Sequence, residues 1–255
     1  GDKIIKENYL KIKMSEIKAI AFDLEGTTVD LEWIHHKGHI MALEEIGIVL
    51  SLEECLDRLP HFIGGPDEEV AKDMARLAST RGITANYKDI LMRTKNYYKN
   101  LLKGADIKPR EGFIGFVTAL KNSGIKFTIG SLTDESQARI ILEKTGFIDL
   151  FGEENIVLKE HVSRLKPAPD VWIETAKRAG VKPSNQLIFE DSPIGIQGGI
   201  KVGAYCIGMP VYNKPNVIKE LVYAGAKRIF FNWNEISPEN LIININQERA
   251  NHDNK

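Results

Sequence analysis

The sequence predicts an α/β protein: a Rossmann-like, doubly wound parallel sheet with an all-helical domain inserted into it. Two observations lead to this fold class. Short apolar runs alternate with helical patterns over most of the chain, which is typical of parallel sheets. Residues 32–108 interrupt this alternation without a clear strand. A chain of 255 residues is long enough for a large α/β domain that carries such an insertion.

Six apolar runs have the length and composition of buried strands. They are residues 17–22, 126–131, 155–158, 186–190, 204–208 and 228–231. Helical patterns separate most of these runs, over residues 110–123, 134–145, 169–179, 194–202 and 214–224. A glycine follows the end of each of these helices, where a left-handed C-cap is expected.

The inserted region carries its own helix signals. Ser51 and Glu54 have the spacing of a capping box, which marks the start of a helix. Pro66 and Asn86 stand where two further helices would begin. Residues 32–108 are therefore predicted to form a separate helical domain.

These signals give the domain boundaries. We assign residues 15–31 and 109–235 to the core domain and residues 32–108 to the inserted domain. The ends of the chain, residues 1–14 and 244–255, are rich in polar and charged side chains and are expected to be flexible.

The composition is that of an ordinary globular protein. With a net charge of −1, electrostatics give no reason to expect nucleic acid or an anionic membrane as a partner. The apolar runs are too short to span a bilayer, and residues 1–13 lack the apolar core of a signal peptide. Cys55 and Cys206 are expected to be buried free thiols, which suits a reducing cytoplasm. We expect a monomer or a weak homodimer.

Two carboxylates follow the first predicted strand and form the most informative pattern in the chain. Asp23 and Glu25 stand two residues apart where that strand ends, and Gly26 allows a sharp turn after them. Thr27 adds a hydroxyl to the same turn. Ligand sites of open α/β sheets lie at the carboxyl ends of their strands. The pattern indicates a nucleophilic carboxylate with an acid/base beside it, whereas a solvated turn is the alternative for such a pair taken alone.

Three further segments carry residues that suit a phosphate group and a metal ion. Ser131 and the backbone N–H of Leu132 can hold a phosphate oxygen, although Ser131 can equally cap the next helix. Lys166 precedes two prolines, on a segment expected to be stiff and extended, so its ammonium can be fixed near a transferring phosphoryl group. Glu190 and Asp191 end another strand, and their carboxylates are ligands that suit Mg²⁺.

In this order, the four segments resemble the motifs of the haloacid dehalogenase superfamily. The resemblance covers most of residues 17–210. The chain looks like the branch with a helical cap after the first motif, which includes beta-phosphoglucomutase and many small-molecule phosphatases. The runs Lys-Pro-Ala-Pro-Asp from Lys166 and Glu-Asp-Ser-Pro-Ile-Gly from Glu190 match two motifs of that branch. The resemblance implies a phosphatase core, a cap domain and a small phosphate ester as substrate.

The resemblance also implies a role for each matched residue. Asp23 is the expected nucleophile, which forms an aspartyl-phosphate, and Glu25 stands at the position of the acid/base. The residues expected to bind the phosphoryl group or support its loop are Thr27, Ser131, Leu132 and Lys166. The expected ligands of a Mg²⁺ cofactor are Asp23, Glu190, Asp191 and the backbone carbonyl of Glu25.

The predicted function is therefore Mg²⁺-dependent hydrolysis of a small phosphorylated metabolite. The runner-up is a sugar-phosphate mutase, which grips a second phosphate with basic and amide groups after the serine of its second motif. Here that stretch contains Asp134 and Glu135, which would repel a second phosphate. Three further alternatives remain. The run from Asp23 to Thr28 resembles the start of enolase-phosphatases, and residues 26–30 resemble phosphonoacetaldehyde hydrolase, although that enzyme has Ala where Glu25 stands. Because the family usually has Asp at the position of Glu25, the third alternative is a phospho-ligand binding protein without turnover.

Overall fold

The computed structural model describes residues 16–63 and 66–252. The predicted flexible segment 1–14 and the last three residues of the chain lie outside this description. None of the helices within the described ranges combines the length and the hydropathy needed to cross a membrane.

The chain divides into two compact units, each with its own buried apolar cluster. One unit joins the residues up to Asp30 to those from Lys108 onward, and the other comprises Leu31–Ile107. Two chain segments connect the units, as expected for a domain inserted into another.

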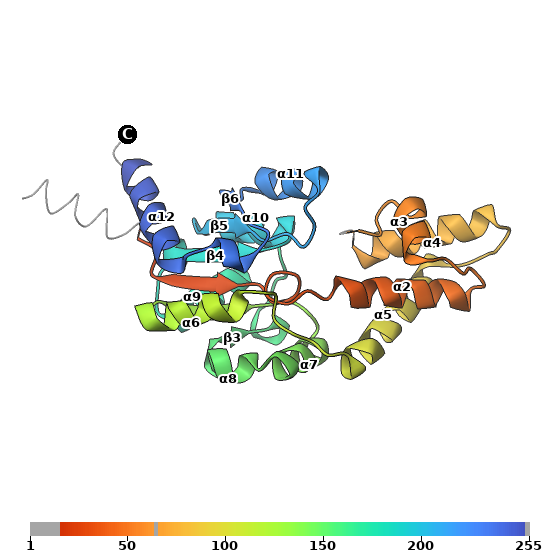
Figure 1. The fold of residues 1–255 in the computed structure, drawn as a ribbon, viewed down its shortest axis with the longest axis horizontal. Coiled ribbons are helices and arrows are strands. Elements are labelled where there is room, and N and C mark those ends of the chain that lie inside the picture. Colours follow the sequence, from red (N-terminus) through yellow and green to blue (C-terminus); the bar gives the residue numbers. More distant parts are fainter. Residues whose placement is uncertain (1–15, 64–65, 253–255) are drawn as a thin grey trace, which may run out of the picture. The chain divides into compact units, whose positions relative to one another are not determined.

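The larger unit is built on a six-stranded parallel sheet, which confirms the predicted fold class (Figure 1). The strands lie in the order β3-β2-β1-β4-β5-β6. Their bounds are β1 Ala19–Phe22, β2 Lys126–Gly130, β3 Ile156–Val157, β4 Gln186–Glu190, β5 Tyr205–Gly208 and β6 Arg228–Ile229. After β1 the chain builds β2 and β3 on one side of it and then crosses to build β4, β5 and β6 on the other side. The carboxyl end of β1 is therefore a topological switch point, where ligands of such sheets bind.

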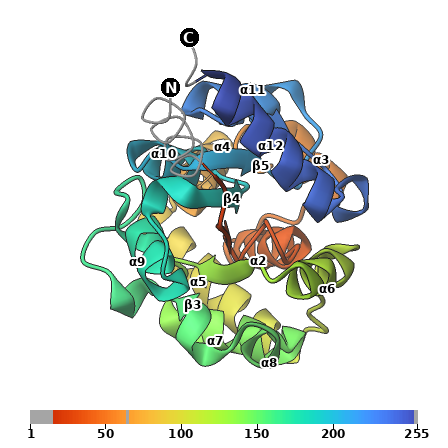
Figure 2. The same cartoon turned by 90° about the vertical axis from the view of Figure 1, so that its left-hand side faces the viewer.

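Successive side chains of β1 point to opposite faces of the sheet, and helices pack on both faces. Ala21 packs in a cluster with Trp172 of α9, whereas the Phe22 ring packs edge-on against Phe113 of α6 and against Trp233. In Figure 2, α9 and α10 lie on one side of the strands, and α6 and α12 lie on the other. The helices of this unit are α6 Phe113–Ser123, α7 Glu135–Thr145, α8 Phe147–Phe151, α9 Asp170–Ala179, α10 Pro193–Lys201, α11 Pro215–Ala224 and α12 Pro238–His252.

The prediction of a flexible C-terminal segment was wrong for residues 244–252, which form the second half of α12. Ile245 is fully buried, and the side chain of Asn246 accepts a hydrogen bond of 2.8 Å from the backbone N–H of Ile17. Arg249 donates to two backbone carbonyls of the core. The polar side chains therefore do not indicate flexibility here, because several of them attach the helix to the core.

The smaller unit consists of helices in the part that the structure describes. They are α2 Glu32–Glu45, α3 Leu52–Arg58, α4 Asp67–Thr80 and α5 Tyr87–Gly104. The capping box of Ser51 and Glu54 is formed at the start of α3. The side chain of Asn86 accepts from the backbone N–H of Lys88 at the start of α5. Both caps agree with the helix starts that the sequence predicts.

Candidate active site

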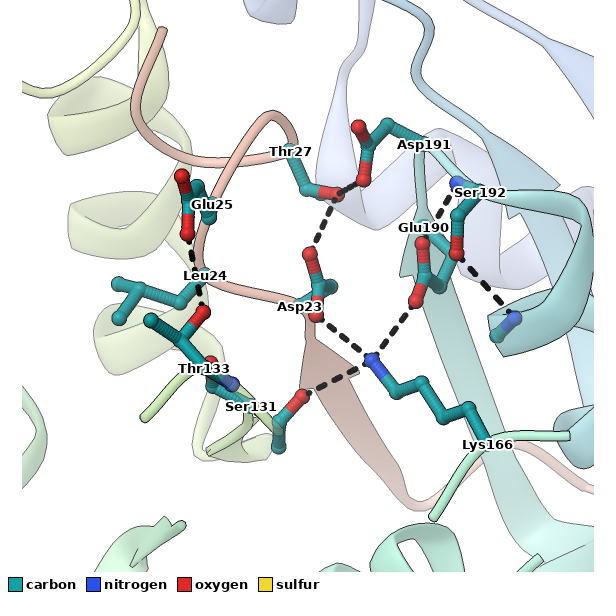
Figure 3. Close-up of polar contacts among 12 residues, drawn as sticks. Asp23, Leu24, Glu25, Thr27, Ser131, Thr133, Lys166, Glu190, Asp191 and Ser192 are labelled. Atoms are coloured by element: carbon teal, nitrogen blue, oxygen red, sulfur yellow. Dashed lines mark hydrogen bonds and ion pairs between the residues drawn. The ribbon is translucent and has the colours of Figure 1, made fainter. Parts of the chain in front are cut away.

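Three neighbouring strands bring the predicted site residues together (Figure 3). Asp23 follows β1, Ser131 follows β2, and Glu190 is the last residue of β4. Since β1 lies between β2 and β4 in a parallel sheet, these positions meet at one edge. Lys166 reaches the same place from the segment before α9.

Lys166 lies at the centre of this group. Its ammonium donates hydrogen bonds of 2.7 Å to Oδ1 of Asp23 and 2.7 Å to Oε1 of Glu190. The side chain is only 7% exposed, and burial alone would disfavour its charge. The two carboxylates outweigh burial and raise the pKa of Lys166, so the side chain is a fixed cation at neutral pH.

The segment that carries Lys166 is a turn and not the extended stretch that its prolines suggest. The backbone N–H of Ala168 donates to the carbonyl of Leu165 over 2.9 Å, which closes the turn. The ammonium of Lys166 is nevertheless fixed in place, as predicted, because it donates hydrogen bonds to Asp23 and Glu190.

The carboxylates of Asp23, Glu190 and Asp191 form a cluster that can hold a metal ion. One oxygen from each lies within 4.8 Å of the others. Burial and the neighbouring Glu190 raise the pKa of Asp23 to about 7, although Lys166 lowers it. Burial and the carboxylates of Glu190 and Asp23 raise the pKa of Asp191 well above its usual range. Three carboxylates against one ammonium leave a net charge of −2 when all are ionised, which a divalent cation would balance.

Two glycines make room for this cluster. Gly26 has a φ of +87°, and a Cβ atom there would overlap the Asp191 carboxylate. A Cβ atom at Gly195 would overlap the carboxylate of Glu190. Glu190 is held tightly in this space, because its Oε2 accepts from the backbone N–H of Ser192 over 2.7 Å.

The two residues predicted to supply hydroxyl groups, Thr27 and Ser131, follow the neighbouring strands β1 and β2. The Thr27 hydroxyl is 3.2 Å from Oδ1 of Asp191 and 3.5 Å from Oδ2 of Asp23. Ser131 is fully buried at the end of β2, and its hydroxyl accepts from the backbone N–H of Thr133 over 3.3 Å. Ser131 does not cap α7, which begins after Asp134. The alternative role of Ser131 as a helix cap is therefore wrong.

Glu25 has a partner that the sequence does not reveal. The Thr133 hydroxyl donates to Oε2 of Glu25 over 3.0 Å. Figure 3 shows the Glu25 carboxylate next to Thr133, on the other side of Asp23 from Glu190 and Asp191. Glu25 is thus separated from the acidic cluster, although it follows Asp23 by only two residues.

Arg110 supports the loop that contains Gly26 and Thr27, and no motif singles it out in the sequence. Its guanidinium donates to five backbone carbonyls from three segments that follow β1, β5 and β6. The acceptors are Gly26 at 2.9 Å, Thr27 at 3.3 Å, Met209 at 2.8 Å, Pro210 at 3.3 Å and Phe231 at 2.7 Å. Its five N–H donors in a planar fork make such a set of contacts possible.

We predict that Arg110→Met destabilises the protein by at least about 3 kcal/mol, because several partly buried carbonyls lose their donor at once. Urea unfolding followed by circular dichroism measures this change. Arg164→Met is the matched control, because Arg164 is 70% exposed and pairs with Asp170 on the surface. The control should lose about 1 kcal/mol or less. Equal losses in the two variants would contradict the role of Arg110.

Comparisons with known proteins find relatives of this chain by sequence and by structure. The sequence profile of a family described as haloacid dehalogenase-like hydrolase matches residues 20–209. Hexitol phosphatase A of Escherichia coli (strain K12) is 28% identical over 75% of this chain and 82% of its own. Beta-phosphoglucomutase of Bacillus subtilis (strain 168) is 27% identical over 76% of this chain and 83% of its own.

A solved structure shows the same architecture. The crystal structure of a HAD family hydrolase from Deinococcus radiodurans R1, with bound phosphate and sodium, superimposes with a TM-score of 0.71. The match covers 91% of this chain and 98% of that one, at 26% sequence identity. This chain therefore shares its fold with that hydrolase over most of its length.

Proposed function

Because the chain belongs to the haloacid dehalogenase-like hydrolase family, we propose that it hydrolyses small phosphate monoesters with Mg²⁺ as cofactor. One observation carries the proposal. The buried carboxylate of Asp23 contacts the ammonium of Lys166 and lies in one cluster with the carboxylate of Asp191, and the buried Ser131 follows the neighbouring strand at the same edge of the sheet. A nucleophile, a fixed cation and a cluster of oxygen ligands in one place are what phosphoryl transfer requires.

The donor set fits Mg²⁺. This ion prefers one or two carboxylates together with waters and phosphate oxygens, and the cluster offers oxygen donors only. We propose Asp23, Asp191 and the backbone carbonyl of Glu25 as ligands, with Glu190 in the same cluster. Glu190 also orients Lys166, because each of its two oxygens accepts a hydrogen bond. When bound, Mg²⁺ would neutralise negative charge on the cluster and on the phosphoryl group.

The residues then divide the reaction into two steps. In the first, an oxygen of Asp23 attacks phosphorus, the bond to the leaving oxygen breaks, and Glu25 gives that oxygen a proton. In the second, Glu25 takes a proton from a water that attacks the aspartyl-phosphate, which releases phosphate and restores Asp23. Lys166, the Ser131 hydroxyl and the backbone N–H of Leu132 stabilise the charge on the transferring group.

The relatives suggest which substrates to test first. One is named a hexitol phosphatase and another a fructose-1-phosphate phosphatase, so we propose a phosphorylated sugar or sugar alcohol. We also propose that the helical unit Leu31–Ile107 acts as the cap that selects the substrate. The cytoplasm remains the proposed compartment, because Cys55 and Cys206 are both free and buried.

A phosphate-release screen tests the proposed function. The purified protein is incubated with p-nitrophenyl phosphate and with a panel of sugar and hexitol phosphates, in Mg²⁺ and in excess chelator. We expect phosphate release that chelator abolishes and added Mg²⁺ restores. Absence of release from every ester would contradict the proposed hydrolase, and undiminished release in chelator would contradict the proposed cofactor.

We also predict that water, and not a second sugar phosphate, accepts the phosphoryl group. Asp134 and Glu135 are exposed at the start of α7, and the nearby Lys159 is already paired with Asp134 at 2.8 Å. This arrangement offers little net positive charge for a second phosphate. Incubation with beta-glucose 1-phosphate, Mg²⁺ and a trace of glucose 1,6-bisphosphate should yield free phosphate or no product. Efficient formation of glucose 6-phosphate would instead establish the mutase.

A further inference from the structure

We propose that Thr133 is the positioning residue for Glu25, and that its hydroxyl fixes the acid/base side chain for proton transfer. The hydrogen bond from Oγ1 of Thr133 to Oε2 of Glu25 is 3.0 Å long (Figure 3). It connects the loop after β1 to the loop after β2. This inference rests on the proposed function, because it assumes that Glu25 transfers a proton.

The side chain of Glu25 needs such a partner for a physical reason. A glutamate has one more rotatable bond than an aspartate, so its carboxylate is spread over more positions unless a contact holds it. Proton transfer requires the carboxylate to lie within hydrogen-bond reach of the leaving oxygen or of the attacking water. Glu25 is only partly buried, so packing alone does not confine it.

Thr133 is itself well fixed. Its backbone N–H donates to the hydroxyl of Ser131, and the next residue, Asp134, begins α7 by accepting from the backbone N–H groups of Gln137 and Ala138. A β-branched side chain has few allowed χ1 values, so a rigid backbone also fixes the hydroxyl.

The hydrogen bonds of Thr133 therefore join two functional groups of the site. Its hydroxyl donates to Glu25, and its backbone N–H donates to Ser131, which we propose as a ligand of the phosphoryl group. A carboxylate held in this way keeps a constant position relative to the phosphorus atom. Thr133 therefore sets the distance between the carboxylate of Glu25 and the oxygen with which it exchanges a proton.

A double-mutant cycle tests this inference. Three single variants are compared. Thr133→Val keeps the shape of the side chain without the hydroxyl, Thr133→Ser keeps the hydroxyl, and Glu25→Gln removes the acid/base. A double variant combines Thr133→Val with Glu25→Gln. The rate of the first step is measured as release of the leaving group in a single turnover, because the second step is the same for every ester. The substrates are a hexitol phosphate, whose leaving oxygen needs a proton, and p-nitrophenyl phosphate, whose leaving group does not. Thr118→Val is the control, because the exposed Thr118 hydroxyl bonds only to the carbonyl of Ile114 in its own helix.

We expect Thr133→Val to slow the first step for the hexitol phosphate about tenfold, the size expected for one lost hydrogen bond to a charged group. The loss should be smaller for p-nitrophenyl phosphate, Thr133→Ser should retain most of the activity, and Thr118→Val should behave as the unmodified protein. In the Glu25→Gln background, Thr133→Val should change the first-step rate less than twofold, because the two residues act as a unit.

Two results would overturn the inference. One is an equal loss of the first-step rate for both esters, which would mean that the hydroxyl does not act on proton transfer to the leaving oxygen. The other is a loss that persists in full after Glu25→Gln. Either result leaves the proposed hydrolase standing, because the unmodified protein would still release phosphate. A protein that hydrolyses no ester would contradict the proposed function itself, and the role of Thr133 with it.

Discussion

Asp23→Asn is expected to reduce phosphate release by at least about 10⁴-fold, because the variant lacks the group that would attack phosphorus. Asparagine has nearly the same shape, but its amide is a poor nucleophile. The fold should be retained, since the substitution removes the charge of one of three clustered carboxylates and so reduces the repulsion between them. Unfolding in urea should therefore occur at the same or a higher concentration than in the unmodified protein.

Asp149→Asn is the control for this experiment, because Asp149 lies exposed on α8, away from the site. Its phosphate release should equal that of the unmodified protein. Substantial turnover by a folded Asp23→Asn variant would show that another residue is the nucleophile, or that water attacks the ester directly.

The second large effect is expected from Lys166→Met. This variant removes the ammonium that contacts Asp23 and Glu190 at 2.7 Å each and leaves two buried carboxylates without their cation. We expect kcat to fall on the order of 10²–10³-fold, as when a charge-stabilising donor is lost from an active site. The free energy of unfolding should also fall, by about 3 kcal/mol, because one partner of a buried ion pair is removed.

Lys177→Met is the matched control, since Lys177 is 77% exposed and pairs only loosely with Glu174 on the surface of α9. It should lose neither turnover nor measurable stability. If Lys166→Met retained full turnover, the ammonium would have no part in stabilising the transferring group.

The sequence allows the sheet and the main site residues to be predicted for a simple physical reason. Buried parallel strands require short apolar runs, and Asp23, Ser131 and Glu190 each stand directly after or at the end of such a run. Parallel strands bring their carboxyl ends to one edge, so position along the chain is enough to predict convergence. Lys166 joins the group through a motif and not through strand geometry.

Other features depend on tertiary contacts that leave no local pattern. Arg110 is a single charged residue in a connecting segment, and only the folded chain shows its five carbonyl partners. The hydroxyl of Thr133 contacts Glu25, which is distant along the chain, so only the folded chain shows this pair. The polar end of α12 resembles a flexible tail until its hydrogen bonds to Ile17 and the core carbonyls are seen.

The central claim is that Asp23 receives the phosphoryl group, and the Glu25→Gln variant offers the most direct test. Without the base that would activate water, the aspartyl-phosphate should accumulate. After mixing with p-nitrophenyl phosphate and Mg²⁺, we expect a burst of about one p-nitrophenolate per protein, as for an accumulating covalent intermediate. Mass spectrometry of the acid-quenched protein should then locate one phosphoryl group on Asp23. Phosphate release without a phosphorylated protein, or a phosphoryl group on another residue, would contradict the account.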